Sequence, residues 1–386
     1  MLNFDFHNPT KIVFGKDRIA DIAKLVPADA KVLILVGGAS AEKTGTLGEV
    51  RQALGERVHA TFSGIEPNPS FDNAMEAVKQ VRDGGFTFLL AVGGGSVIDA
   101  TKFIAAAALF EGDPWDILLS WGGKITQALP FGTVLTLPAT GSEMNSAAVI
   151  TRRDIGAKRP FRSPKVFPLF SVLDPAKTYT LPMPQIANGV VDAFVHTVEQ
   201  YLTYPSSAPV QDRFAEGLLQ TLIEVGPRLL TAPEPVYDDR ANLMWTATLA
   251  LNGLIGAGVP QDWATHMIGH ELTALHNIDH ARTLAIVLPS LLQERRVQKH
   301  AKLLQYGERV WGITTGTEEE RVTAAIEATR AFFEQMGIPT RLKDHGLGAK
   351  DIDAVVSQLE EHGMTQLGEQ REITPAVSRR ILEAAL

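Results

Sequence analysis

The first half of the chain alternates short apolar runs with amphipathic stretches. The apolar runs, rich in β-branched and aromatic residues, are Lys31–Val36, Thr87–Val92, Val134–Leu137 and Phe170–Leu173. Between them, stretches such as Phe71–Arg82 and Ile98–Ala108 repeat apolar residues at helical spacing and are long enough for crossover helices. Strands that alternate with helices are typical of a parallel sheet covered by helices. The pattern therefore predicts an α/β fold for the first half.

The second half of the chain follows a helical pattern throughout. Prolines interrupt the sequence within Leu181–Gln185, and no run of alternating β-residues follows them. The helices predicted beyond this point are Gly189–Leu202, Val210–Ile223, Arg240–Gly253, Leu291–Trp311 and Glu318–Met336. Because one hydrophobic core rarely serves 386 residues, we expect an α/β domain over residues 1–180 and an all-helical domain over residues 181–386.

Composition and charge narrow the class of protein. A net charge of -8 without a basic block argues against a nucleic-acid partner, which needs clustered Lys and Arg. No apolar run approaches the ~20 residues of a membrane helix, and the N-terminus lacks the basic start and apolar core of a signal peptide. The absence of cysteine excludes disulfides and thiolate nucleophiles and fits a reducing cytoplasm. We expect a cytoplasmic protein, mature from Met1, in which His and carboxylate side chains must hold any metal.

A glycine-rich turn follows the second predicted strand. Gly93, Gly94, Gly95 and Ser96 stand between Thr87–Val92 and a helix that carries Asp99. Consecutive glycines at a strand-to-helix turn let backbone N–H groups approach a pyrophosphate, which the helix N-terminus also attracts. The spacing matches neither G-x-G-x-x-G nor the Gly-Lys-Ser/Thr ending of a nucleotide-hydrolysing loop. A dinucleotide-phosphate cradle and a tight structural turn both remain open.

A second turn bears on the choice of cofactor. The first predicted strand ends at Gly37 and Gly38, with Ser40 two residues later and no acidic residue to hold the ribose hydroxyls of NAD. A 2′-phosphate can be bound there by hydrogen-bond donors, namely Ser40, the glycine amides and Lys43. The turn therefore favours NADPH, with an ordinary structural turn as the alternative.

A metal site is predicted from two separate segments. Asp192 and His196 lie four residues apart on one predicted helix, so they share a face and can chelate one ion, although a solvated helix face commonly shows such a pair. Over Ala241–His270 the only charged residue is Asp262, which predicts a buried segment. Histidine side chains inside a buried segment need hydrogen-bond or metal partners.

That buried segment and its continuation supply three histidines. His266 and His270 lie inside it, and His280 follows past a predicted turn at Asn277. Together with Asp192 and His196 they can furnish a four-coordinate divalent site with one spare imidazole. His270-Glu271 begins like a zinc-peptidase helix, but Ala274 stands where the second histidine must be, so the peptidase interpretation is rejected.

At these residues the sequence resembles the iron-containing alcohol dehydrogenase family, and within it the branch of bacterial NADPH-dependent aldehyde reductases and butanol dehydrogenases. The resemblance covers essentially the whole chain. The segments that carry it are TKIVFGK from Thr10, GIEPNP from Gly64, AVGGGSVIDATKFIA from Ala91, LTLPATGSE from Leu135, LDP from Leu173, NGVVDAFVHTVEQY from Asn188 and WATHMIGHELTALHNIDHA from Trp263.

The resemblance implies an N-terminal dinucleotide domain and a C-terminal helical domain, with the metal in the cleft between them. The metal ligands that it implies are Asp192, His196, His266 and His280. His270 becomes a catalytic residue near the substrate, as a proton relay or positioning group. Implied cofactor contacts are Gly37, Gly38, Ser40, Gly93, Gly94, Gly95, Ser96, Asp99, Thr136, Thr140, Ser142, Asn145, Lys158 and Leu173. Many relatives carry an Asp after the first strand and use NAD, whereas Gly38 and Ser40 match the NADPH branch.

The expected activity is the reversible, NADPH-linked reduction of a short-chain aldehyde to a primary alcohol, with one divalent ion, zinc or iron. An NAD-dependent polyol or glycerol-type dehydrogenase, or a dehydroquinate synthase relative, should show extra basic residues facing the metal. A metal-dependent hydrolase would ignore nicotinamide cofactors. A non-catalytic binding protein gives no reason for four metal-capable side chains. The N-terminal strand Ile12–Phe14 can pair across a two-fold axis, so a homodimer is expected.

Overall fold

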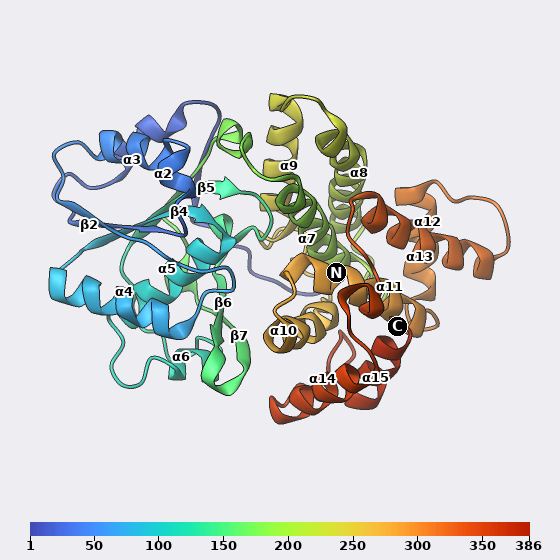
Figure 1. Ribbon diagram of the computed structural model, residues 1–386. Helices are drawn as coiled ribbons and strands as arrows, with labels where there is room; N and C mark the ends of the chain where they lie inside the picture. Colours follow the sequence, from blue (N-terminus) through green and yellow to red (C-terminus); the bar gives the residue numbers. More distant parts are fainter. The chain divides into compact units, whose positions relative to one another are not determined.

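The computed structural model describes residues 1–386, which divide into two compact units (Figure 1). The sheet unit comprises His7–Pro182 and Pro235–Thr248, and the helical unit comprises Met1–Phe6, Met183–Glu234 and Leu249–Leu386. The division into domains at residue 180 stays a prediction. The compact units differ from it in the first six residues and in most of helix α9 (Tyr237–Ala250), which joins the sheet unit.

The sheet unit is built on six parallel strands in the order β1-β8-β5-β4-β2-β3. These are β1 (Lys11–Phe14), β2 (Val32–Val36), β3 (His59–Phe62), β4 (Phe88–Gly94), β5 (Phe131–Leu137) and β8 (Phe170–Leu173). Val32 of β2 pairs with Phe88 of β4 and Lys11 of β1 with Phe170 of β8, while the ladder between β4 and β5 shifts register between Gly93 and Gly94. All four strands predicted from apolar runs are present, and the α/β prediction is confirmed. Strand β3 was not predicted.

Each face of the sheet is covered by helices. Leu33 and Leu35 of β2 pack in one core cluster with α4 (Phe71–Gly84) and α5 (Gly95–Ala107). Val32, Ile34 and Val36 point to the other face, where they share a cluster with α1 (Ile22–Leu25) and α3 (Thr46–Leu54). Burial on both faces explains why the strands are continuous apolar runs.

An antiparallel hairpin, which the sequence did not predict, accompanies the main sheet. Strand β6 (Ala147–Arg152) pairs with β7 (Ala157–Arg162), and Ile150 and Phe161 join the core cluster of α4 and α5. Pro160 and the basic residues of β7 obscure the alternation that identifies a strand. Besides α1, the short α-helices of this unit are α2 (Ser40–Lys43) and α6 (Asp116–Leu119).

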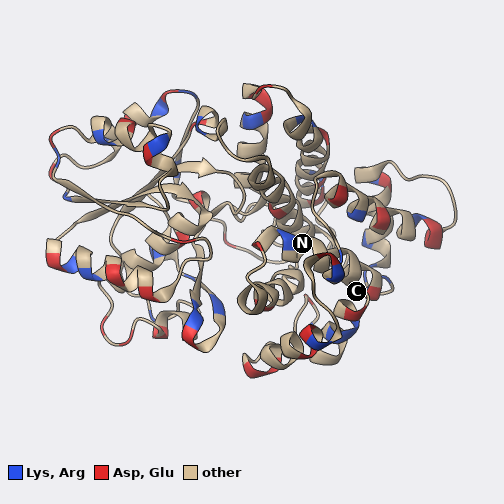
Figure 2. Ribbon diagram, in the orientation of Figure 1, with Lys and Arg blue, Asp and Glu red and all other residues tan.

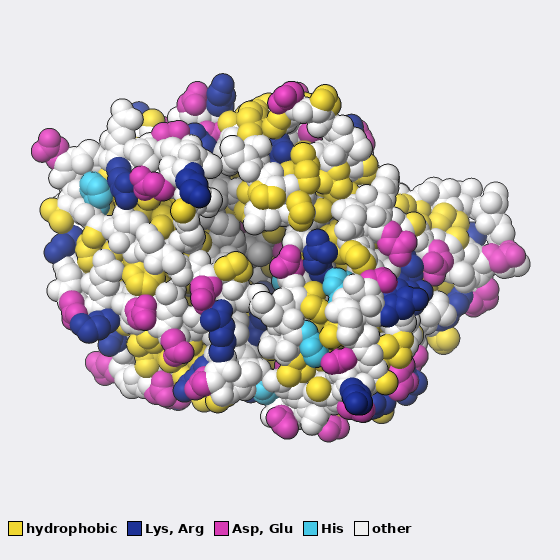
Figure 3. Space-filling view, in the orientation of Figure 1, with side chains coloured by type: hydrophobic (Ala, Val, Ile, Leu, Met, Phe, Trp, Pro, Cys, Tyr) yellow, Lys and Arg dark blue, Asp and Glu magenta, His cyan; other side chains and the backbone are white.

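The helical unit contains eight α-helices. They are α7 (Met183–Tyr201), α8 (Pro209–Thr231), α10 (Ala264–His276), α11 (His280–Glu294), α12 (His300–Trp311), α13 (Glu318–Gln335), α14 (Ala349–Glu361) and α15 (Pro375–Glu383). No helix of the chain is long and apolar enough to span a bilayer. Figure 2 shows α10 mostly without charged residues, whereas α14 and α15 carry both signs. On the face seen in Figure 3, acidic and basic side chains are intermingled.

The prediction of one helix over Leu291–Trp311 is wrong, because the chain breaks it at residues 295–299. The Lys299 side chain turns inward, where its Nζ lies 2.9 Å from Asp262 Oδ2 and 2.7 Å from Glu369 Oε1. These buried ion pairs are tertiary contacts, and helical periodicity along the sequence carries no information about them.

Candidate active site

Helix α7 presents three polar side chains on one face. Asp192, His196 and Glu199 follow at intervals of four and three residues, so they lie one above the other. All three are at least 95% buried. Almost the whole of α7 is buried, which excludes the alternative of a solvated pair at Asp192 and His196.

Three imidazoles surround the Asp192 carboxylate. His196 Nδ1 lies 3.7 Å from Asp192 Oδ1, and His266 Nε2, from α10, lies 4.0 Å from the same oxygen. His280, the first residue of α11, places its Nε2 3.8 Å away. Asp192 Oδ1 is buried and accepts no hydrogen bond. The four predicted ligands, from three helices, therefore converge on one point of the helical unit.

This arrangement fits a divalent cation. The separations of 3.7 to 4.0 Å are too long for hydrogen bonds. Two atoms that each bind one tetrahedral ion at ~2.1 Å stand roughly 3.4 Å apart, close to what is found here. The ligand atoms of Asp192, His196 and His266 all lie within 4.8 Å of one another. A buried carboxylate oxygen without a donor, ringed by imidazole nitrogens, has the chemistry of a metal cage.

The fifth predicted residue, His270, lies beside this cage. Its ring centroid is 5.1 Å from that of His280 and 6.2 Å from that of His266. The His280 side chain is 22% exposed, against 4% for Asp192, so the cage is most accessible at His280. His270 thus lies next to the accessible ligand. Its catalytic role and the ligand roles of the other four residues stay predictions.

Local backbone features hold the histidine segments in place. Trp263, which precedes α10, and Asn277, which follows it, both adopt left-handed backbone conformations, with φ of 69° and 53°. Asn188 on α7 donates a hydrogen bond of 3.1 Å to Asp279 Oδ2, directly before His280. The two left-handed residues mark the ends of α10, and the hydrogen bond from Asn188 connects the start of α11 to α7.

Glu199 is a buried residue of this site that was not predicted from the sequence. Its Oε2 is hydrogen-bonded to His266 Nδ1, and its Oε1 accepts the Thr265 backbone N–H at 2.7 Å. Burial, followed by the charge of Asp262, raises the pKa of Glu199, while hydrogen bonds from the Thr265 and His266 N–H groups act in the opposite direction. An acidic residue three positions after His196, on the same face of a buried helix, was the signal that could have identified it.

The glycine turn of the sheet unit joins β4 directly to α5. A Cβ at Gly93 would meet Val97 Cγ2 at 2.5 Å, and one at Gly95 would meet Thr140 Oγ1 at 2.4 Å. The close packing of the protein itself therefore requires glycine at both positions. Gly94 and Ser96 are partly exposed at the start of α5. Close packing explains these glycines, and the binding of a pyrophosphate at the same turn stays a prediction.

A buried polar cluster supports this turn. Lys102 Nζ donates to Ser142 Oγ at 2.8 Å, Asn145 Oδ1 at 2.8 Å and the Ala147 carbonyl at 2.7 Å. Ser142 Oγ in turn donates to Asp99 Oδ1 at 2.6 Å. Burial lowers the pKa of Lys102 to about 7 and raises that of Asp99. Three of the predicted cofactor contacts therefore make their side-chain hydrogen bonds with other protein groups: Asp99, Ser142 and Asn145.

The other predicted cofactor contacts differ in exposure. Gly38 and Ser40 are exposed after β2, whereas Gly37, Thr136 and Thr140 are partly exposed. Lys158 donates a hydrogen bond of 2.9 Å to Asn68 Oδ1, and Leu173 is fully buried in the core. Their roles toward a cofactor stay predictions.

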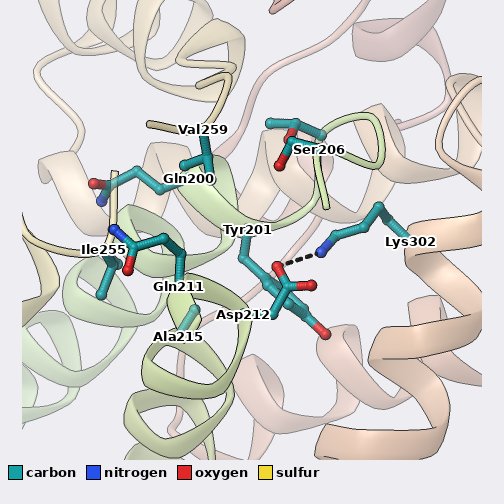
Figure 4. A pocket seen from close by; sticks show the side chains of 10 residues that line it. Gln200, Tyr201, Ser206, Gln211, Asp212, Ala215, Ile255, Val259 and Lys302 are labelled. Carbon is teal, nitrogen blue, oxygen red and sulfur yellow. Dashed lines mark hydrogen bonds and ion pairs between the residues drawn. The ribbon is translucent and has the colours of Figure 1, made fainter. Parts of the chain in front are cut away.

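A separate pocket lies within the helical unit (Figure 4). It is lined by residues of α7, α8 and α12, among them Gln211, Asp212 and Lys302. Lys302 Nζ pairs with Asp212 Oδ1 at 2.7 Å, and Gln211 Nε2 donates to the Leu254 carbonyl at 2.6 Å. These polar side chains have partners within the protein, and none of the predicted site residues lines the pocket.

The chain belongs to the iron-containing alcohol dehydrogenase family. The family model described as iron-containing alcohol dehydrogenase matches residues 9–175, and the model of the family's C-terminal part matches residues 186–385. The family resemblance predicted from the motifs is confirmed, and the chain is an oxidoreductase of this family.

Relatives match along the full length. The NADPH-dependent aldehyde reductase YqhD of Escherichia coli K12 is 62% identical over 387 residues, covering 100% of each chain. A probable NADH-dependent butanol dehydrogenase of Bacillus subtilis is 39% identical, again over 100% of both. The crystal structure of E. coli YqhD superimposes with a TM-score of 0.98 over 100% of this chain and 99% of that one. The structure of an NADH-dependent butanol dehydrogenase from Thermotoga maritima, 37% identical, gives 0.95, over 100% and 99%.

Proposed function

We propose that this protein reduces short-chain aldehydes to primary alcohols with NADPH, reversibly, and that one divalent ion, zinc or iron, serves the reaction. The observation that carries the proposal is Asp192 Oδ1, a buried carboxylate oxygen that has no hydrogen-bond donor and lies among the nitrogens of His196, His266 and His280. The 62% identity to an NADPH-dependent aldehyde reductase supports the choice of substrate and cofactor.

The donor set suits both metals. One carboxylate and three imidazoles are ligands that zinc and iron accept, so the side chains do not distinguish them. When bound, such an ion acts as a Lewis acid toward a carbonyl oxygen.

The protein's own residues have two tasks in this proposal. Asp192 and the three imidazoles hold the ion, with the accessible side of the cage at His280. His270, whose ring lies 5.1 Å from that of His280, positions the substrate oxygen or delivers the proton that the alcohol needs.

The cofactor is proposed to bind on the sheet unit. Backbone N–H groups of Gly94 to Ser96, at the start of the 13-residue helix α5, suit a pyrophosphate because they add hydrogen bonds to the helix dipole. Gly38 and Ser40 are exposed after β2 and have no acidic neighbour in the turn, which suits the 2′-phosphate of NADPH.

The experiment follows the loss of NADPH absorbance with butanal as substrate and compares it with NADH. We expect kcat/KM to be about tenfold or more higher with NADPH, the effect of one charge-assisted hydrogen bond to the 2′-phosphate. A preference for NADH would refute the cofactor choice, and no oxidation of either cofactor would refute the activity.

We propose in addition a cytoplasmic homodimer. The absence of cysteine fits a reducing compartment. Strand β1 pairs with β8 on one side only, so it offers its other edge to a second copy. The mass of the protein in solution tests this assembly, with a monomer as the contradicting result.

A further inference from the structure

We propose that Glu199 is a positioning residue, which sets the tautomer of His266 so that Nε2 is the nitrogen available to a metal. The proposal rests on the proposed function in taking His266 as a ligand. In this proposal Glu199 acts through the imidazole of His266.

The hydrogen bonds of Glu199 define its orientation. Oε2 is bonded to His266 Nδ1, and Oε1 accepts the backbone N–H groups of Thr265 at 2.7 Å and His266 at 3.4 Å. The carboxylate is 2% exposed, so water does not compete for these bonds. Both oxygens face the first turn of α10.

These bonds decide which ring nitrogen carries the hydrogen. The two backbone N–H groups that donate to Oε1 favour the ionised carboxylate, and an ionised carboxylate only accepts, so the hydrogen between Oε2 and Nδ1 belongs to Nδ1 of the imidazole. A neutral imidazole with its hydrogen on Nδ1 keeps a lone pair on Nε2. His266 Nε2 is the atom that lies 4.0 Å from Asp192 Oδ1, inside the cage. Carboxylates that bond the second nitrogen of a ligating histidine act in this way in metal sites.

The backbone around Glu199 is held as firmly as its side chain. The Glu199 carbonyl accepts the Asp262 N–H at 2.8 Å, and Asp262 Oδ1 accepts the Ala264 N–H at 2.9 Å at the start of α10. Lys299 pairs with the other oxygen of Asp262 at 2.9 Å. The start of α10, and with it His266, is thereby tied to α7.

The substitution Glu199→Gln separates shape from hydrogen-bond chemistry. Glutamine has the same size but only one acceptor oxygen, which cannot serve both the Thr265 N–H and Nδ1. With the oxygen kept on Thr265, the amide N–H₂ faces Nδ1, which must then accept, and the hydrogen moves to Nε2. We expect the affinity for Zn²⁺ to fall roughly 10- to 100-fold.

The first readout is the affinity of the metal-free protein for Zn²⁺, measured by competition with a chromophoric chelator. The matched control is Glu216→Gln, a carboxylate that is 3% exposed in the same unit and accepts from the Tyr201 hydroxyl. Glu216 touches none of the predicted ligands, so its variant should bind Zn²⁺ as the wild type does. Equal affinities in both variants would overturn the proposal.

The second readout needs no metal. Nitrogen NMR of ¹⁵N-histidine-labelled, metal-free protein reports the tautomer of His266, assigned by its loss in His266→Asn. The wild type should carry the hydrogen on Nδ1 and Glu199→Gln on Nε2. An Nε2 hydrogen in the wild type contradicts the proposal even if the variant does not fold. If wild type and His196→Ala bound Zn²⁺ equally, the proposed metal site would fail, and the NMR result would still decide the role of Glu199.

Discussion

The polar clusters around Lys102 and around Asp192 are both buried, yet they use their hydrogen-bonding capacity in opposite ways. Lys102 donates three hydrogen bonds to protein acceptors, and Asp99 accepts two, from Ser142 and from the Val149 N–H. Asp192 Oδ1 accepts none, although three imidazole nitrogens lie within 4.0 Å of it. Since buried polar atoms are normally paired, the first cluster is complete within the protein, whereas we expect the open acceptor of the second to bind a ligand.

The difference changes what we expect of the predicted cofactor contacts. Next to the glycine turn that starts α5, Lys102 donates hydrogen bonds to Ser142 and Asn145, and Ser142 donates one to Asp99. We expect their effect on NADPH binding to be indirect, through the loops that they hold. The exposed Gly38 and Ser40 are expected to act directly. Substitutions in the two clusters should therefore have different signatures.

The largest effect is expected from Asp192→Ala, which removes the only negative charge of the cage. Metal and activity should be lost together, with kcat/KM lower by about 10³-fold or more, because the metal supplies several kcal/mol of the stabilisation. Metal content per chain and the rate of butanal reduction check this. An Asp192→Ala protein that retained its metal would show that the cage is not the metal site.

Lys102→Met tests the cluster that is complete within the protein. Three buried acceptors lose their donor, so we expect a loss of about 3 kcal/mol in the free energy of unfolding, without loss of bound metal. Urea unfolding and metal analysis measure the two quantities. Loss of metal in this variant would show that the two clusters are not independent.

The stability difference between the wild type and Lys102→Met should depend on pH in a defined direction. Because burial lowers the pKa of Lys102 from 10.5 to about 7, the native state binds fewer protons than the unfolded state between these values. Stability should rise with pH in this window, and the contribution of Lys102 is lost as pH falls toward 7. The gap between wild type and Lys102→Met in urea midpoint should therefore widen from about pH 7 to about pH 9.5. A gap independent of pH contradicts the lowered pKa.

His270→Ala tests whether His270 contributes to catalysis without contributing to metal binding. The ring lies beside His280 but is not a predicted ligand, so metal content should be unchanged while kcat falls about 10²-fold, the usual contribution of a positioned acid or base. Steady-state kinetics on metal-replete protein measure this. A His270→Ala protein with unchanged kcat removes the residue from the mechanism.

Gly38→Asp should have the smallest effect and the most selective one. A Cβ at Gly38 meets nothing within 4 Å, so the fold should tolerate the change, while the carboxylate repels a 2′-phosphate and can accept from ribose hydroxyls. We expect the ratio of kcat/KM for NADPH to that for NADH to fall about tenfold. Gly48→Asp, also in open space, is the matched control and should leave the ratio unchanged.

The sequence predicted those parts of the fold whose periodicity is local. The four central strands were found because both of their faces are buried, which leaves a continuous apolar run. The break at residues 295–299 depends on Lys299 reaching Asp262 and Glu369, partners far away in the sequence. The placement of α9 in the sheet unit depends on contacts such as Thr248 Oγ1 with Glu143 Oε1 at 2.5 Å. Helical spacing does not reveal a helix's partners.

In the candidate site, too, local sequence patterns were predictable and contacts between separate helices were not. The spacing of Asp192 and His196, and the histidines in a segment almost free of charge, indicated a site that the structure assembles. Glu199 was missed because an acidic residue one turn beyond a histidine is common on solvated helix faces. Its hydrogen bonds with His266 Nδ1 and the Thr265 N–H, both on another helix, cannot be seen in the sequence.

The most direct test of the account is a metal titration of stringently metal-free protein, with the rate of NADPH oxidation by butanal recorded after each addition. We expect no activity at the start, a linear rise with added Zn²⁺ or Fe²⁺, and an end point at one ion per chain, with no rise in Asp192→Ala. Full activity in the metal-free protein would contradict it.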